Sequence, residues 1–168
     1  MNDTGTIFST GHSSGTTSGA GPAAERLTVS AVAPDLYKAQ LGLEAAVRRS
    51  GIEPLLYELI KIRASQINGC AFCLDMHTRD ASKLGESDRR LHLIAAWRDT
   101  DLFTERERAA LALTEAVTLV SVDHVPDAVW DAAARLFDPA ELSAVLMGIV
   151  VINGWNRISI ASRTPLPD

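Results

Sequence analysis

The chain has 168 residues, of which 46% are hydrophobic and 22% charged, and its formal net charge is -5. This length suits one domain with one hydrophobic core, and the acidic balance without any run of Lys or Arg argues against nucleic acid or an anionic membrane surface as partner. Residues 1–22 contain no basic segment followed by an apolar one, so they do not predict a secretory signal. The most apolar stretch, residues 142–152, has only about half of the roughly 20 residues that a bilayer crossing requires. We therefore expect a cytoplasmic protein with no membrane span.

The first segment, residues 1–24, is rich in Gly, Ser and Thr and has no apolar periodicity. Such a segment cannot bury enough surface to offset the entropy lost on ordering, so it predicts a disordered tail. Residues 25–168 are then expected to form a single folded domain.

Helical periodicity begins at Ala33, where apolar residues start to recur every three or four positions, and no later stretch alternates as a half-buried strand does. The fold class that this pattern predicts is all-α. We expect helices over about residues 34–47, 53–67, 70–84, 87–97, 126–137 and 139–157, and one more that begins near residue 104.

Local signals mark several of these boundaries. Thr104 with Glu107, and Asp138 with Glu141, are spaced as capping boxes, in which each side chain accepts a hydrogen bond from a free backbone N–H group. Gly85 follows the third expected helix, at a position that favours a left-handed residue.

The last expected helix is apolar on nearly every face between Ala144 and Val151. A helix of this kind is normally buried all round. It forms either the centre of the core or an interface between subunits, since both arrangements remove the same apolar area from water.

Two cysteines, Cys70 and Cys73, are spaced as a CxxC pair, and His77 follows four residues after Cys73. In a reducing compartment such a pair is more typical of redox chemistry or metal binding than of a structural disulfide. If a helix begins at Cys70, the three side chains lie on one face. The helix dipole and an adjacent imidazolium lower the pKa of a thiol at this place. One thiolate can then attack a substrate, the second thiol can resolve the product, and His77 can relay the proton.

Other interpretations of the same residues stay open. Cys70, Cys73, His77 and Glu58 just suffice in number for a zinc site, although the chain lacks a second CxxC. The cysteines can also be inert core residues. Glu58, taken alone, is typical of an exposed helix carboxylate, and only its spacing to Cys70 singles it out.

A resemblance to a known family rests on the segment from Glu58 to His77. Its residues are Glu58, Lys61, Arg63, Ser65, Gln66, Asn68, Gly69, Cys70, Cys73 and His77. The pattern is a Glu, then eleven residues, a Cys, two residues, a second Cys, three residues and a His. This spacing is far more specific than CxxC alone. The segment resembles the core signature of the AhpD-like branch of the carboxymuconolactone decarboxylase family. The closing helix, with Asn153, Trp155, Asn156, Arg157 and Arg163, also resembles that of many members.

The resemblance implies an AhpD-like helical bundle that assembles into homotrimers or homohexamers. It implies that Cys73 is the attacking thiol, Cys70 the resolving thiol, and Glu58 with His77 the proton relay that activates Cys73. The implied activity is reduction of an alkyl hydroperoxide or hydrogen peroxide through a dithiol/disulfide cycle, with an external dithiol as reductant. We expect no cofactor and no bound metal.

One position departs from the family pattern. Members that are coupled to a reductase carry a His directly before the second cysteine, where this chain has Phe72. Phe72 cannot join a proton relay, so the resemblance does not by itself extend to peroxidase turnover with the same reducing partner. The decarboxylase branch generally lacks the CxxC, and the family's name is therefore not taken as the reaction of this protein.

The remaining charged and aromatic residues have ordinary interpretations. Lys61 and Arg63 are expected as solvated helix charges, with Arg63 also a candidate partner for an acidic group inside the assembly. His92 and His124 have no partner at helical spacing that indicates ligation. The tryptophans are expected to pack; they are Trp97, Trp130 and Trp155.

Two functions remain as alternatives to the peroxidase. The same residues can hold a metal, or sense oxidation, without fast turnover, and the metal content of the protein distinguishes the metal-binding case. Alternatively, Glu58 and His77 can act as acid and base in a lyase that acts on a ring lactone. Such a lyase would remain active after both cysteines are replaced.

Overall fold

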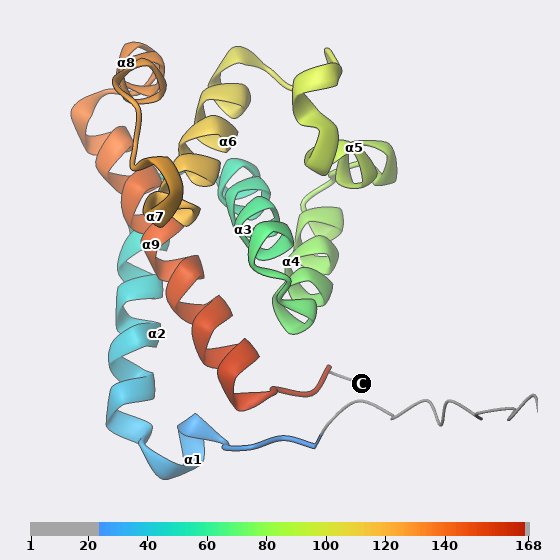
Figure 1. Ribbon diagram of the computed structural model, residues 1–168, viewed down its shortest axis with the longest axis vertical. Helices are drawn as coiled ribbons and strands as arrows, with labels where there is room; N and C mark the ends of the chain where they lie inside the picture. The colour runs from blue at the N-terminus through green and yellow to red at the C-terminus, as the bar shows by residue number, and fades with distance from the viewer. Residues whose placement is uncertain (1–23, 167–168) are drawn as a thin grey trace, which may run out of the picture.

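Helices account for the regular structure of residues 24–166, the part of the chain that the computed structural model describes, and no strand occurs there (Figure 1). The expected all-α fold is thus confirmed. The predicted tail lies outside the described residues except for its last residue, Ala24. The elements are α1 (Val29–Val32), α2 (Pro34–Arg49), α3 (Pro54–Asn68), α4 (Ala71–Lys83), α5 (Asp88–Leu93), the 3-10 helix η1 (Ile94–Asp99), α6 (Glu105–Thr118), α7 (Val120–Asp123), α8 (Asp127–Leu136) and α9 (Pro139–Ser162).

Both predicted capping boxes are present. Thr104 accepts a hydrogen bond from the backbone N–H of Glu107, whose side chain accepts one from Thr104, and Asp138 and Glu141 form the same pair at the start of α9. Gly85 has a φ of 95°, as expected after α4. These helix ends depend on residues close in sequence, which is why the pattern alone predicted them.

The structure differs from the prediction around Trp97. The expected helix over residues 87–97 ends at Leu93, and η1 continues with a non-helical Ala96. The Arg108 guanidinium donates hydrogen bonds to the carbonyl oxygens of Trp97 and Thr100, at 2.8 Å each, and the Trp97 indole N–H donates to a Glu115 oxygen. Contacts with α6 thus favour a turn where local propensity favours a continued α-helix.

Three further differences concern helix ends and short helices. Helix α9 runs to Ser162, five residues past its expected end near residue 157, and the short helices α1 and α7 were not expected. Ser162 is buried, and its carbonyl accepts a hydrogen bond from the backbone N–H of Arg26. The segment before α1 therefore passes beside the end of α9 (Figure 1).

Helix α3 is the central helix of the bundle. It contacts α4, α6 and α9, which surround it in Figure 1. Its residues 56–62 are all buried, and Ile60 packs in one apolar cluster with Leu113 of α6 and Ile149 of α9. A charged side chain in this part of α3 must therefore find its partners inside the fold.

Helix α9 is buried on one side only. Val145, Ile149 and Ile152 are buried in the core, whereas Met147 and Val150 are 39% and 45% exposed. An apolar edge of α9 therefore remains at the surface of the chain, and the alternative of an interface between subunits stays a prediction.

By length and composition, α9 could also cross a membrane. Its mean hydropathy is 1.4 over an 18-residue window, and half of that window is buried inside the fold. A core helix meets the same test, and the contacts of α9 with α2, α3 and α6 are those of a core helix. The cytoplasmic location stays a prediction.

Candidate thiol site

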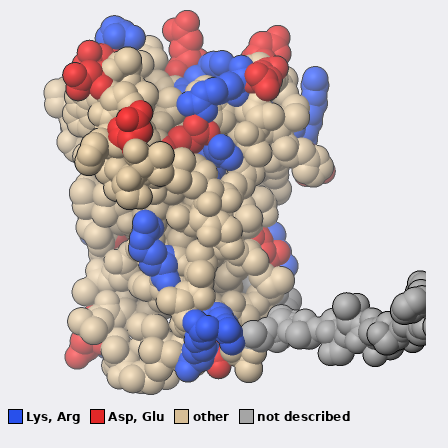
Figure 2. Space-filling view, in the orientation of Figure 1, with Lys and Arg blue, Asp and Glu red and all other residues tan. Residues whose placement is uncertain are grey.

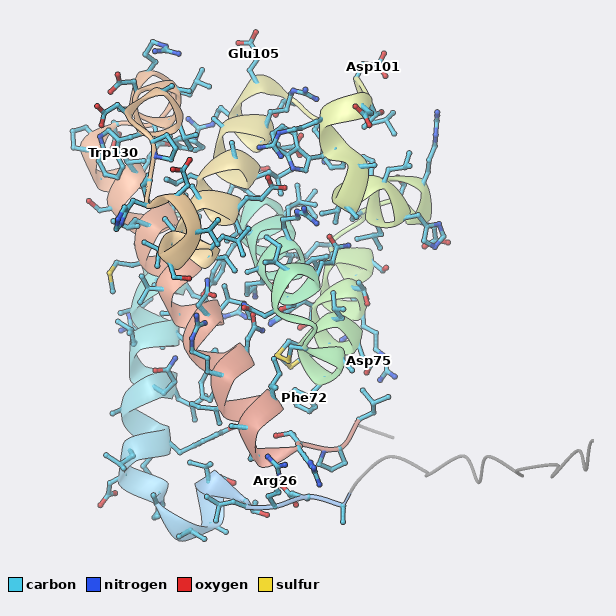
Figure 3. The ribbon with its side chains drawn as sticks, viewed as in Figure 1. Arg26, Phe72, Asp75, Asp101, Glu105 and Trp130 are labelled. Atoms are coloured by element: carbon cyan, nitrogen blue, oxygen red, sulfur yellow. A yellow bond between two sulfur atoms is a disulfide. The ribbon has the colours of Figure 1, made fainter. Side chains whose placement is uncertain are left out.

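The two cysteines lie at the start of α4. Gly69, in a left-handed conformation with a φ of 71°, ends α3 and turns the chain so that Cys70 becomes the N-cap of α4. The Cys70 sulfur accepts a hydrogen bond from the backbone N–H of Cys73 at 3.3 Å. Both residues are buried, and a disulfide joins them with their Cα atoms 5.4 Å apart. Figure 3 shows this disulfide beside Phe72.

A buried acid–histidine pair lies next to the disulfide. His77 is one turn after Cys73 on α4, and its Nδ1 atom is 3.0 Å from Glu58 Oε2 on α3. Because a carboxylate can only accept, Nδ1 carries the shared proton, and in the neutral imidazole Nε2 then has the lone pair. Glu58 and His77 are 2% and 4% exposed, so the interpretation of Glu58 as an exposed helix carboxylate is wrong. The structure brings all four predicted site residues together at the α3–α4 contact.

Glu58 stays ionised despite its burial. Burial alone raises the pKa of this carboxyl, but the hydrogen bond from His77 and the positive charge of Lys61 outweigh burial and hold the pKa below its ordinary value. Lys61 Nζ lies 2.6 Å from Glu58 Oε1. Burial lowers the pKa of Lys61, and the Glu58 carboxylate partly offsets this effect.

The expectation for Lys61 as a solvated charge is therefore wrong, since the residue is fully buried. Its sequence neighbours carried a signal for this burial. Lys61 stands three residues after Glu58, between the apolar residues Ile60 and Ile62. Arg63 is also no solvated charge, because its Nε donates to Glu115 at 2.8 Å, and this acidic partner belongs to the same chain.

A cavity of about 400 Å³ opens beside Cys73 and His77. Its aromatic walls come from distant parts of the chain, with Tyr37 on α2 and Trp155 on α9 in edge-to-face contact at 5.1 Å. The other large apolar side chains of the lining are Leu27, Leu41, Phe72, Met76 and Ile158. The expectation that Trp155 merely packs thus missed its place in the cavity wall.

Three side chains place atoms of the kind that bind metals close to one another. Ligand atoms of Glu58, His77 and Asp80 lie within 4.8 Å of one another. Both Glu58 oxygens already accept hydrogen bonds, and Asp80 pairs with Lys83 at 2.9 Å. The two sulfurs of the hypothetical zinc set are bonded to each other. In this arrangement both Glu58 oxygens and both sulfurs have partners within the protein.

Among residues 24–166, the other histidines and tryptophans lie apart from this cavity's lining. His92 and His124 are exposed. Trp97 is buried as expected, but Trp130 on α8 is 40% exposed and packs only in part.

The helical bundle and the buried Glu58, His77 and CxxC group define a protein of the AhpD-like class. The sequence profile of the carboxymuconolactone decarboxylase family matches residues 34–116, a range that includes all four of these residues. The chain is 41% identical over 137 residues to the uncharacterised protein YdfG of Bacillus subtilis (strain 168), covering 82% of this chain and 93% of YdfG. It is 33% identical over 119 residues to the uncharacterised protein YnjA of Escherichia coli (strain K12), covering 70% and 64%. The chain therefore belongs to the carboxymuconolactone decarboxylase family.

Solved structures agree with this assignment. Protein ATU0492 of Agrobacterium tumefaciens, of unknown function and suggested to be the antioxidant defence protein AhpD, superposes with a TM-score of 0.84 at 36% identity, over 86% of this chain and 99% of that one. The debrominase Bmp8 superposes with a TM-score of 0.73 at 23% identity, over 82% of this chain and 74% of Bmp8. At that identity Bmp8 shows a shared fold alone.

Proposed function

We propose that this protein is a thiol-dependent peroxidase that reduces organic hydroperoxides, with Cys73 as the attacking thiol. The observation that carries the proposal is the position of Cys73, which lines an apolar cavity together with His77, whereas Cys70 does not line it. Cys73 also lies in the first turn of α4, where free backbone N–H groups and the helix dipole stabilise a thiolate.

The chemistry begins with the reduced pair. His77 Nε2 takes the proton of Cys73, and the thiolate attacks the terminal oxygen of the hydroperoxide. The O–O bond breaks, Cys73 becomes a sulfenic acid, and the alkoxide leaves as an alcohol with the proton from His77. Cys70 then attacks the Cys73 sulfur, the disulfide forms, and the Cys73 hydroxyl leaves as water with the proton of Cys70. An external dithiol returns two electrons and two protons to the pair.

The cavity supports an organic substrate in preference to hydrogen peroxide. Most of the surface that lines it is apolar, and an apolar group gains free energy by leaving water for such a surface. Phe72, in the place of the family's histidine, adds to this apolar wall instead of to the proton relay.

The test is turnover of cumene hydroperoxide with dithiothreitol by the wild type, Cys73→Ser and Cys70→Ser, with free thiols counted before and after one equivalent of oxidant. We expect the wild type to lose both thiols and to turn over, and Cys73→Ser to do neither. Thiols that are never lost, with no activity in any of the three proteins, would refute the peroxidase. Metal in the purified protein would then favour the binding function, and lactone chemistry that remains in a double Cys→Ser variant would favour the lyase.

We further propose that copies of the chain assemble through apolar surface. Met147 and Val150 on α9 are exposed, as are Leu119, Val120 and Val122 where α6 passes into α7. Figure 2 shows charged side chains gathered toward the end that holds α5, α6 and α8, whereas the face over α7 and α9 has few. Light scattering should give the mass of a trimer or hexamer, and Val150→Glu should lower it. A monomeric wild type contradicts this proposal.

A further inference from the structure

Lys61 is a lysine with no exposed surface, in the middle of α3. Its neighbours Ile60 and Ile62 are equally buried, so an apolar side chain here would avoid the free-energy cost of desolvating an ammonium group. Replacing a buried ion pair by apolar residues is often neutral or stabilising, so stability alone does not account for a lysine at this position. Buried titratable groups of this kind cluster at functional sites.

The two oxygens of Glu58 have different partners. Oε1 accepts a hydrogen bond from Lys61 Nζ at 2.6 Å, and Oε2 accepts one from His77 Nδ1 at 3.0 Å. The ammonium nitrogen of Lys61 also lies 4.3 Å from the centroid of the Tyr57 ring, a cation–π contact that restricts its position. The lysine thereby holds the carboxylate in the rotation that presents Oε2 to the imidazole.

We propose that Lys61 is a positioning residue of the thiol site, whose ammonium keeps Glu58 ionised and oriented toward His77. Glu58 then fixes the Nδ1 proton of His77, and Nε2 is the atom that accepts the proton of Cys73. The proposal rests on the proposed function in one respect, that Cys73 is the thiol that His77 serves. Lys61 itself does not line the cavity.

Other ionisable groups surround the buried pair. They are Glu44 and Arg48 from α2, Tyr57 from α3, and His77 and Asp80 from α4. The Arg48 guanidinium is 4.0 Å from Glu58 Oε1, but 52% of its side chain is exposed, so water screens its charge. The charge of Lys61 acts without that screening, because its side chain is fully buried.

The loss of this buried cation should shift the pH at which the Cys73 thiolate forms in a definite direction. When His77 accepts the proton of Cys73 it becomes an imidazolium, and the ionised Glu58 that Lys61 maintains stabilises this cation together with the thiolate. Without the charge of Lys61, the Cys73 thiolate should form at a higher pH. A lysine with a purely structural role would change stability and leave the pH dependence of Cys73 where it was.

The test is the rate at which iodoacetamide alkylates Cys73 as a function of pH, in reduced full-length protein that carries Cys70→Ser. Lys61→Met removes the charge, Lys61→Arg keeps it, and Lys38→Met is the control, because the Lys38 side chain is 76% exposed. We expect Lys61→Met to move the midpoint of the profile upward by about one pH unit, and Lys38→Met to leave it unchanged. Lys61→Arg should restore at least half of the shift.

Lys61→Gln is the second uncharged variant, since it keeps an N–H donor for Glu58 without the charge. It should show the same upward shift if Lys61→Met does not fold. An unshifted midpoint in either folded uncharged variant overturns the proposal, and so does a failure of both to fold, which would make Lys61 a structural residue. Alkylation needs no peroxide, so this proposal can fail while peroxidase activity stands, and the reverse also holds.

Discussion

Helix α3 contributes to two clusters of charged groups that differ in what they can do. In the first, Glu58 joins Lys61 and His77 beside the disulfide. In the second, Arg63 donates to Glu115 of α6 at 2.8 Å, and the Trp97 indole N–H donates to the same oxygen at 2.9 Å. Both clusters satisfy buried or half-buried charge, but they are built from different chemical groups.

The difference lies in which groups can exchange a proton near neutral pH. The cations around Glu115 are the guanidinium groups of Arg63 and Arg98, which keep their charge at every physiological pH. The first cluster contains an imidazole, the side chain whose charge changes in that range, one turn away from Cys73. The Glu115 cluster therefore fastens α3, α6 and η1 together, whereas the Glu58 cluster is suited to moving a proton.

Glu58→Gln should have the largest effect on activity. The amide cannot hold the Nδ1 proton of His77 as a carboxylate does, so kcat/KM for cumene hydroperoxide should fall about hundredfold, the usual scale of a lost acid–base contribution. The matched variant is Glu115→Gln, which should keep kcat/KM within about threefold because it changes no group near the cavity. Equal losses of activity in the two variants would remove the distinction between the clusters.

Glu115→Gln should have the larger effect on stability. A neutral amide leaves Arg63 and Trp97 without a shared anionic acceptor, and we expect the free energy of unfolding to fall by about 1–3 kcal/mol. Urea unfolding followed by circular dichroism measures it. A variant as stable as the wild type would show that the second cluster does not fasten these helices together.

Trp155→Ala tests the cavity beside the first cluster. The loss of this aromatic wall should raise KM for cumene hydroperoxide about tenfold and change kcat/KM for hydrogen peroxide little, because the smaller substrate gains less from apolar contact. Trp130→Ala is the control, since Trp130 is 40% exposed on α8 and does not line the cavity. Similar effects of Trp155→Ala on both peroxides would argue against an organic substrate in this cavity.

The smallest expected effect is on the pH dependence of stability. Burial raises the pKa of Glu115, but the hydrogen bonds from Trp97, Arg98 and Arg63 outweigh burial and lower that pKa below its ordinary value of 4.5. A carboxyl with a depressed pKa in the folded state contributes stability above its unfolded pKa, and this contribution is lost as the pH falls through the folded pKa. Below about pH 4.5 the wild type should therefore lose stability more steeply than Glu115→Gln. Parallel curves of unfolding free energy against pH would contradict this.

Local patterns predicted much of the fold and the candidate residues. The four site residues come together because one short segment contains them all, from α3 through the turn at Gly69 into the first turns of α4. They are Glu58, Cys70, Cys73 and His77. Such a short path leaves few alternatives for the chain. The capping boxes at Thr104 and Asp138 were predicted correctly for the same reason, since their partners are also close in sequence.

Features that depend on distant contacts were not predictable in this way. The cavity wall joins Tyr37 with Trp155, residues that are far apart in the sequence. The break between α5 and η1 depends on Arg108 of α6, which donates hydrogen bonds to the carbonyl oxygens of Trp97 and Thr100, earlier in the chain. Periodicity describes one helix at a time and says nothing of these partners.

The most direct test of the account is to trap the oxidised thiol. Cys70→Ser protein is reduced, mixed with one equivalent of cumene hydroperoxide in the presence of dimedone, and digested for mass spectrometry; Cys73→Ser is treated in the same way. The account predicts a dimedone adduct on the peptide that contains Cys73 and no adduct on Cys70 in the second variant. An adduct on Cys70 alone, or none in either protein, would contradict the central claim that Cys73 is the thiol that attacks the peroxide.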